Sequence, residues 1–272
     1  MTDSLADVRR VRVHHLLAAK QRGERWAMLT AYDAQVARLF DEAGIPVLLV
    51  GDSVGTTVLG RPTTVAVTVQ EMALFGAAVV AAVRRALVVV DLPFGSYEAG
   101  PAQALTTAVE LMKRTGAAAV KLEGGASRAP SVAALVDAGI PVMGHVGFTP
   151  QREHALGGYR VQGRGDDGDR IAADAAALAR AGAFAVVLEM VPGAVAARVA
   201  GELAIPVVGI GAGSGTDAQV LVWTDLAGLT TGPVPSFVRR YAELGSMLTS
   251  AVRQYAADVA DGSFPGAQHT FD

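Results

Sequence analysis

Short apolar runs rich in Val, Ile and Leu recur along the chain between longer Ala-rich stretches. Runs that are apolar throughout, rather than at alternate positions, are typical of parallel strands buried on both faces. We predict eight such strands, at Met28–Ala31, Val47–Gly51, Leu87–Val90, Ala118–Leu122, Val142–His145, Ala185–Leu188, Val207–Ile210 and Leu226–Leu229.

The stretches between these runs carry helix signals. Thr68 and Glu71 have the spacing of a capping box at a helix start. The sequence Gly-Ile-Pro occurs at 44–46 and again at 139–141, where Gly ends a helix and Pro opens the next strand. The chain therefore consists of repeated strand–helix units.

Eight units favour a closed (β/α)8 TIM barrel. An open doubly wound sheet would need five or six strands and usually a Gly-rich turn after the first, which this chain lacks. No linker or composition shift divides the sequence, so we predict one catalytic domain over 1–272. A helical extension over 1–24, with its helix at 9–22, precedes the barrel, and a tail over 255–272 follows it. The Gly- and Asp-rich segment 160–169 predicts a long mobile loop.

The composition of the chain limits the classes of molecule that the protein is expected to bind. The 23 basic and 26 acidic residues nearly cancel, and no basic block points to nucleic acid. The absence of cysteine excludes disulfides and thiolate chemistry, and no signal pattern opens the chain, so we expect a cytoplasmic enzyme of small molecules. The longest apolar runs, such as 73–83, are shorter than the roughly 18 residues that a membrane span needs.

Acidic residues stand where predicted strands end. Asp52 and Asp91 follow the second and third strands, Glu123 follows the fourth, and Glu189 follows the sixth. In an α/β barrel these positions share one mouth, where catalytic residues lie. A single Asp after a strand can instead cap the next helix. Four acids at one rim favour the catalytic interpretation.

Three of these acids come from successive strands. Neighbouring strands are about 4.8 Å apart, so Asp52, Asp91 and Glu123 would bring three negative charges close together, and these must be protonated or neutralised. With no Cys and few His, oxygen ligands predict Mg²⁺ or a similar hard ion rather than tetrahedral zinc. Such an ion could chelate a 2-oxo acid and polarise its ketone.

Two further side chains are placed at this mouth. Lys121 lies two residues before Glu123, so both face the barrel interior. Lys121 is either a counter-ion for the acids or a contact to the substrate carboxylate or enolate oxygen, with a Schiff base as a third alternative. His145 ends the fifth strand and is either a buried core residue or a contact to substrate or metal-bound water. The remaining histidines, expected at the surface or in the tail, are His14, His15, His154 and His269.

A glycine run, GIGAG at 209–213, follows the seventh strand. Such a run can bind phosphate through backbone N–H groups. Glycines at a barrel mouth can equally let a substrate approach the backbone, and we favour that interpretation here.

A set of phrases distributed along nearly the whole chain is more specific. These are VGDSVG at 50–55, DLPFGSY at 91–97, VKLEGG at 120–125, GHVGFTPQ at 144–151, GGYRVQGRG at 157–165, VLEMVP at 187–192, GIGAGSGTDAQVLV at 209–222 and SFPGAQHTF at 263–271. Through them the chain resembles the ketopantoate hydroxymethyltransferase family. The resemblance implies a TIM barrel that transfers a hydroxymethyl group from 5,10-methylenetetrahydrofolate to 3-methyl-2-oxobutanoate, and a homo-oligomer, commonly a decamer.

The resemblance also implies residue roles. Asp52 and Asp91 would bind Mg²⁺, with Glu123 as the third acidic ligand, directly or through water. Ser53, Asp91 and Lys121 would contact the keto acid, as would Asp52 and, by its position, His145. The folate site is not assigned.

Glu189 matches the family's proton acceptor. The sixth strand lies across a barrel from the second, which separates Glu189 from the metal cluster and leaves its lone pairs free to accept a proton. The sequence departs from the family at Gly95, where Met is usual, at Met190, where Cys is usual, and at Ala218, where Gly is usual. None of these removes a catalytic oxygen, although Gly95 would loosen the pocket wall.

Two alternatives differ from this interpretation. A barrel of the isocitrate lyase and phosphoenolpyruvate mutase type also gathers acids around Mg²⁺, but those enzymes use a cysteine-containing loop, which this chain lacks. A catalytically silent binding protein on the same scaffold would have lost the acids, and all four are present.

Overall fold

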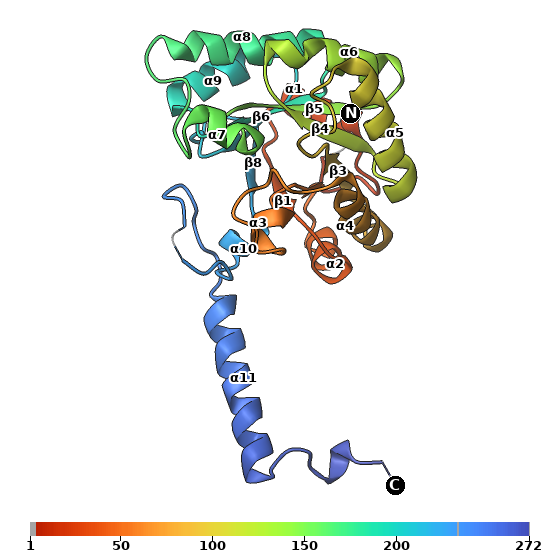
Figure 1. The fold of residues 1–272 in the computed structure, drawn as a ribbon, viewed down its shortest axis with the longest axis vertical. Helices are drawn as coiled ribbons and strands as arrows, with labels where there is room; N and C mark the ends of the chain where they lie inside the picture. The colour runs from red at the N-terminus through yellow and green to blue at the C-terminus, as the bar shows by residue number, and fades with distance from the viewer. Residues whose placement is uncertain (1–3, 233, 272) are drawn as a thin grey trace. The chain divides into compact units, whose positions relative to one another are not determined.

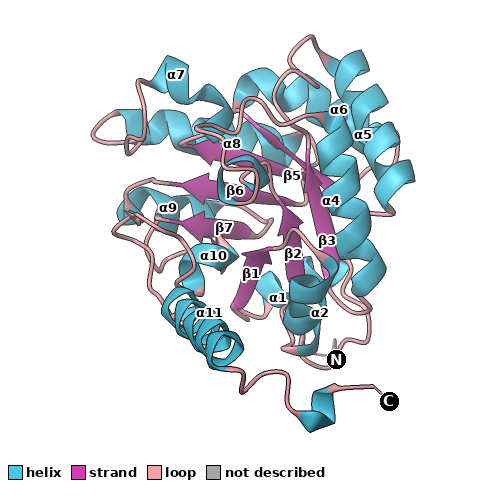
Figure 2. Ribbon diagram, turned by 60° about the horizontal axis from the view of Figure 1, so that its bottom comes forward, coloured by secondary structure: helices cyan, strands magenta, loops and turns pink. Residues whose placement is uncertain are grey.

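The computed structural model describes residues 4–232 and 234–271, and these form two compact units, Met1–Leu221 and Val222–Asp272. Residues 1–3 of the expected extension and residue 272 of the expected tail lie outside the described residues. In the first unit, eight parallel strands close into a barrel with helices around it, as predicted (Figures 1 and 2). The strands are β1 (Trp26–Thr30), β2 (Val47–Val50), β3 (Leu87–Asp91), β4 (Ala119–Glu123), β5 (Val142–Gly147), β6 (Ala185–Glu189), β7 (Val207–Ile210) and β8 (Ala218–Leu221).

Helices alternate with the strands. Those of the first unit are α1 (Val13–Gln21), α2 (Ala34–Glu42), α3 (Val54–Thr57), α4 (Val69–Ala82), α5 (Pro101–Thr115), α6 (Ala129–Asp137), α7 (Glu153–Leu156), α8 (Asp167–Arg180) and α9 (Gly193–Glu202), with 3₁₀ turns η1 (Ala126–Arg128) and η2 (Pro150–Arg152). Those of the second unit are α10 (Trp223–Leu226), α11 (Leu244–Asp261) and the turn η3 (Ala267–His269). Among the described residues, no helix is both long and apolar enough to cross a membrane.

The local signals for helix ends are confirmed. Thr68 and Glu71 form the predicted capping box at the start of α4. After α2 and α6, Gly44 and Gly139 adopt φ values of 88° and 83°, which glycine tolerates without strain. These two turns connect α2 to β2 and α6 to β5.

The helix before the barrel packs against the end opposite to the mouth. Leu16 and Ala19 of α1 join the buried cluster formed by the first residues of the strands, such as Val47 and Leu87. Lys20 of α1 forms a 2.6 Å ion pair with Asp217, directly before β8. The predicted helix at 9–22 is thus confirmed, with observed bounds Val13–Gln21.

The prediction for the eighth strand was wrong. The strand is Ala218–Leu221, whereas Leu226 ends α10 and Leu229 donates its N–H to the Thr224 carbonyl. β8 is short and only alternate positions are buried, so it lacks the continuous apolar signal of the other strands. The apolar run LAGL at 226–229 instead forms the end of α10 and a turn at Gly228, whose φ is 67°.

Two other segments differ from expectation at their ends. α8 begins at Asp167, so the loop predicted over 160–169 ends there. α11 continues through Asp261, so the first part of the expected tail is helical.

Candidate active site

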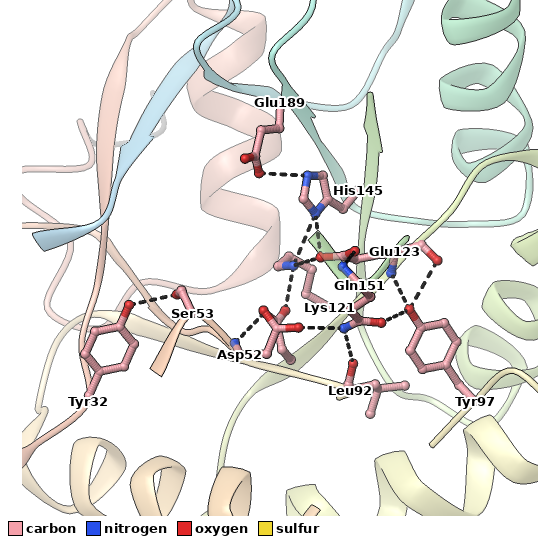
Figure 3. Close-up of polar contacts among 11 residues, drawn as sticks. Tyr32, Asp52, Ser53, Leu92, Tyr97, Lys121, Glu123, His145, Gln151 and Glu189 are labelled. Carbon is pink, nitrogen blue, oxygen red and sulfur yellow. Dashed lines mark hydrogen bonds and ion pairs between the residues drawn. The ribbon is translucent and has the colours of Figure 1, made fainter. Parts of the chain in front are cut away.

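The four predicted acids meet at one mouth of the barrel, and Figure 3 labels three of them, Asp52, Glu123 and Glu189. Asp91, Glu123 and Glu189 end β3, β4 and β6, and Asp52 comes two residues after β2. Asp52, Asp91 and Glu123 are buried, and Asp91 Oδ2 accepts the Asp52 backbone N–H at 3.0 Å. The order of strands in the barrel places β6 opposite β2, as the sequence predicted.

Lys121 is a buried cation among these acids. Its Nζ lies 2.8 Å from Asp91 Oδ1 and 3.9 Å from Glu123 Oε1. Burial alone would lower the pKa of Lys121, but the carboxylates of Asp91, Glu123 and Asp52 raise it above its ordinary value. Lys121 therefore carries a positive charge, and the expectation that it shares a face with Glu123 is confirmed.

His145 connects Glu123 with Glu189. Its Nδ1 lies 3.3 Å from Glu123 Oε1, and its Nε2 lies 3.3 Å from Glu189 Oε2 in an ion pair without ideal hydrogen-bond geometry (Figure 3). Burial and the neighbouring Lys121 lower the pKa of His145, but the two carboxylates outweigh them and raise it to about 9. His145 is buried, as the core interpretation expected, and it links the acid cluster to Glu189.

The electrostatic balance at the mouth is uneven. Burial raises the pKa of Asp52 well above its usual range, and the charges of Glu123 and Asp91 raise it further. Burial also raises the pKa of Asp91, although Lys121 opposes this effect. Glu123 has a lowered pKa, because contacts from His145, Lys121 and Gln151 outweigh its burial. Lys121 thus offsets only part of the effect of burial on the pKa values of the two aspartates, whereas the contacts of Glu123 outweigh its burial.

Two polar residues that the sequence analysis did not single out hold the acids in place. Gln151 donates from Nε2 to Asp52 Oδ2 at 2.9 Å and to the Leu92 carbonyl at 3.0 Å, and its backbone N–H donates to Glu123 Oε2 at 3.1 Å. The Tyr97 hydroxyl donates to Gln151 Oε1 and accepts the Glu123 backbone N–H. Both residues belong to motifs quoted above, DLPFGSY and GHVGFTPQ, and this was the available signal.

Ser53 lies beside the cluster on the β2 side. Its Oγ is 2.7 Å from the hydroxyl of Tyr32, a fully buried residue whose pKa burial raises to about 12. The phenol therefore stays protonated and shares a hydrogen bond with the Ser53 hydroxyl.

The glycine run after β7 is explained by packing. A Cβ on Gly209 would lie 2.8 Å from Thr216 Oγ1, and one on Gly213 would lie 3.0 Å from the Cα atom of Gly193. The Thr216 side chain at Gly209 and the Gly193 backbone at Gly213 leave little room for a side chain, and close packing thus accounts for these two glycines. His14, His154 and His269 are exposed, as expected.

The positions that depart from the family lie in different settings. Gly95 has φ of 84° with open space around a built Cβ. Met190 has φ of 48°, the only positive value for a non-glycine residue in the described chain, and Ala218 starts β8. A side chain at position 95 would thus meet backbone strain rather than a crowded wall.

Comparison with known proteins supports the family resemblance that the sequence motifs indicate. The family model described as ketopantoate hydroxymethyltransferase matches residues 10–267. The 3-methyl-2-oxobutanoate hydroxymethyltransferase of Saccharopolyspora erythraea is 63% identical over 97% of this chain and 90% of its own length. The enzyme of the same name from Acidothermus cellulolyticus is 60% identical over 98% of both chains.

A solved structure shares the fold alone. Phosphonopyruvate hydrolase, crystallised with oxalate and Mg²⁺, superimposes with a TM-score of 0.60 over 94% of this chain and 92% of its own, at 14% sequence identity. The family model and the two relatives decide between the barrel families that share this architecture: the chain belongs to the ketopantoate hydroxymethyltransferase family.

Proposed function

We propose that this chain transfers a hydroxymethyl group from 5,10-methylenetetrahydrofolate to 3-methyl-2-oxobutanoate, giving 2-dehydropantoate and tetrahydrofolate for pantothenate synthesis. Its relatives carry the name of this activity at 54–63% identity over nearly their whole length. The observation that carries the proposal is the placement of Glu189 across the mouth from the buried acids, joined to them through His145.

The keto acid is an anion, and the mouth offers it cations and hydroxyl groups. Lys121 would bind the keto oxygen or carboxylate, and the Ser53 hydroxyl would donate to it while accepting a hydrogen bond from Tyr32. Asp52 and Asp91 frame the same position. The substrate would thus lie with its charged end at β2–β4 and its C3 atom toward Glu189.

The donors at β2 and β3 fit a hard divalent cation. Asp52 and Asp91 are buried carboxylates whose pKa values burial raises, and Lys121, 2.8 Å from Asp91 Oδ1, offsets only part of this effect. These two residues would hold Mg²⁺, which when bound supplies positive charge beside the keto oxygen.

Glu123 would act as the third ligand through water. Its Oε1 faces His145 and its Oε2 accepts from Gln151, so both oxygens already have partners. In the described residues, no three His, Asp or Glu side chains form a ready-made metal group. With a water molecule between Glu123 and the ion, the three carboxylates would not need to lie close enough to contact the ion together.

Glu189 would remove the proton from C3, the carbon that carries two methyl groups and one hydrogen. The electron pair of that C–H bond becomes the enolate, whose charge moves to the keto oxygen near Lys121. In the overall transfer the methylene carbon and one water supply the CH₂OH group on C3, and the two folate nitrogens that held the carbon each gain a hydrogen. The charged His145 holds the Glu189 carboxylate toward the substrate.

Mass analysis of the product tests the function. Incubation with 3-methyl-2-oxobutanoate, methylenetetrahydrofolate and Mg²⁺ should convert the keto acid into a product heavier by one CH₂O unit, in step with formation of tetrahydrofolate. No product from a folded, metal-loaded enzyme would contradict the assignment. A cytoplasmic location and a decameric homo-oligomer are further proposals that rest on the sequence and the family, and light scattering on purified protein tests the second.

A further inference from the structure

One exposed aromatic ring lies close to Glu189. In the described part of the first unit, the exposed aromatic side chains are Phe94, at 43%, and Tyr159, at 61%. Tyr159 lies in the loop between α7 and α8, and its ring rests on Phe148, with centroids 4.6 Å apart and planes tilted by 36°. Phe148 follows β5 directly and is fully buried, so it provides a rigid base for the exposed ring.

Backbone hydrogen bonds attach this aromatic pair to the end of β6. The Phe148 N–H donates to the Glu189 carbonyl at 2.8 Å, and the Gln162 N–H donates to the Met190 carbonyl at 2.9 Å. The two attachments flank Tyr159 along the chain. The Tyr159 ring is therefore held beside the strand end that carries Glu189.

The electrostatics of the phenol agree with this position. Although the Tyr159 side chain is exposed at the surface, its partial desolvation raises the pKa of the phenol, and the carboxylates of Glu153, Glu189, Asp52 and Glu123 raise it further. The hydroxyl group is thus within electrostatic reach of the mouth.

The reaction itself restricts where the one-carbon donor binds. C3 of the keto acid loses its proton to Glu189 and then forms the new carbon–carbon bond, so the donor must approach C3 at the Glu189 end of the substrate. The pterin of the donor is a flat bicyclic ring, and flat rings bind by stacking on aromatic side chains. The end of the site near β2–β4 is taken by the charged end of the substrate.

We propose that Tyr159, supported by Phe148, is the platform on which the pterin ring of methylenetetrahydrofolate stacks. This inference rests on the proposed function and assigns the folate site that the sequence left open. Phe94 lies on the loop after β3, and among the described contacts it has none with Phe148 or Tyr159, so it is not part of this platform.

Replacing Tyr159 with alanine tests the proposal. Loss of one stacking contact, worth about 1–3 kcal/mol, should raise KM for methylenetetrahydrofolate about 5- to 150-fold. Calorimetric binding of tetrahydrofolate to the Mg²⁺- and keto-acid-loaded enzyme should weaken by a similar factor. Tyr159→Phe keeps the ring and should remain close to wild type, and Phe94→Ala is the matched control with an unchanged folate KM.

Folate-independent exchange of the C3 hydrogen separates this proposal from the proposed function. In heavy water with keto acid and Mg²⁺, Tyr159→Ala should exchange at the wild-type rate, which also shows that the variant is folded. An unchanged folate KM, a defect in Phe94→Ala instead, or loss of exchange in Tyr159→Ala would each overturn the platform. Absence of both exchange and transfer in the wild-type enzyme would instead overturn the proposed function.

Discussion

Lys121 is the cation on which the buried acids at the mouth depend, and replacing it with methionine tests that dependence. Its Nζ lies 2.8 Å from Asp91 and 3.9 Å from Glu123, with only 4% of the side chain exposed. At an effective dielectric constant near 20, these contacts give gross attractions of about 6 and about 4 kcal/mol. Desolvation of the ammonium group cancels much of this, and removal of one partner from a buried pair costs about 3–5 kcal/mol. We expect Lys121→Met to lower the free energy of unfolding by that amount.

Urea unfolding in the presence of a chelator measures this loss. Lys113→Met, which removes an exposed lysine from α5, is the matched control and should change stability by no more than about 0.5 kcal/mol. The loss in Lys121→Met should shrink on acidification. Without Lys121, the pKa values of Asp52 and Asp91 rise further in the folded state, so the folded variant takes up protons and gains stability as the pH falls.

Two results would refute this reasoning. A loss below about 1 kcal/mol near neutral pH would mean that Lys121 does not compensate the acids, because exposed pairs give losses of that size. A loss that grows on acidification would contradict the sign of the aspartate shifts. In kinetics, Lys121→Met should raise KM for the keto acid and lower kcat, and borohydride should trap no covalent adduct.

Other predictions concern the metal and His145. Chelation should abolish turnover, and added Mg²⁺ should restore it. Calorimetry should show weaker Mg²⁺ binding in Asp52→Asn and Asp91→Asn than in Glu123→Gln. Full turnover without metal, or negligible effects in all three variants, would contradict the metal assignment. Burial disfavours the charged His145, but Glu123 and Glu189 raise its pKa from 6.5 to about 9. The charged imidazole therefore contributes about 3 kcal/mol to the free energy of unfolding. This contribution is fully present below about pH 6.5 and is lost as the pH rises through 9. Metal-free wild type should lose more stability than His145→Gln between those limits, and parallel losses would show that the imidazole is neutral.

The barrel and its acids could be predicted because parallel strands buried on both faces leave a continuous apolar signal. Seven strands were located in this way, and the acids at their ends then followed from the geometry of a barrel mouth. The two-residue period of a strand likewise placed Lys121 and Glu123 on one face. β8 gave no such signal, because its four residues, only two of them buried, lie beside a more apolar helix end.

Contacts between side chains on different elements could not be predicted from the sequence. The bond from Gln151 to Asp52 joins residues 99 positions apart, and nothing in the motif around Gln151 specifies that partner. The position of His145 was predicted, but its role between Glu123 and Glu189 depends on side-chain directions that a strand pattern does not fix. The platform at Tyr159 depends in the same way on backbone hydrogen bonds between loops.

Hydrogen exchange at C3 tests the central claim, that Glu189 forms the enolate of a keto acid held by the opposite acids. With Mg²⁺ and 3-methyl-2-oxobutanoate in heavy water, the enzyme should replace the C3 hydrogen with deuterium even without folate. Glu189→Gln keeps the size of the side chain but removes its basic oxygen, so exchange and turnover should fall together by roughly 10²- to 10⁴-fold, with metal affinity unchanged. Exchange at the wild-type rate in a variant that has lost transfer would show that another group is the base and contradict the account.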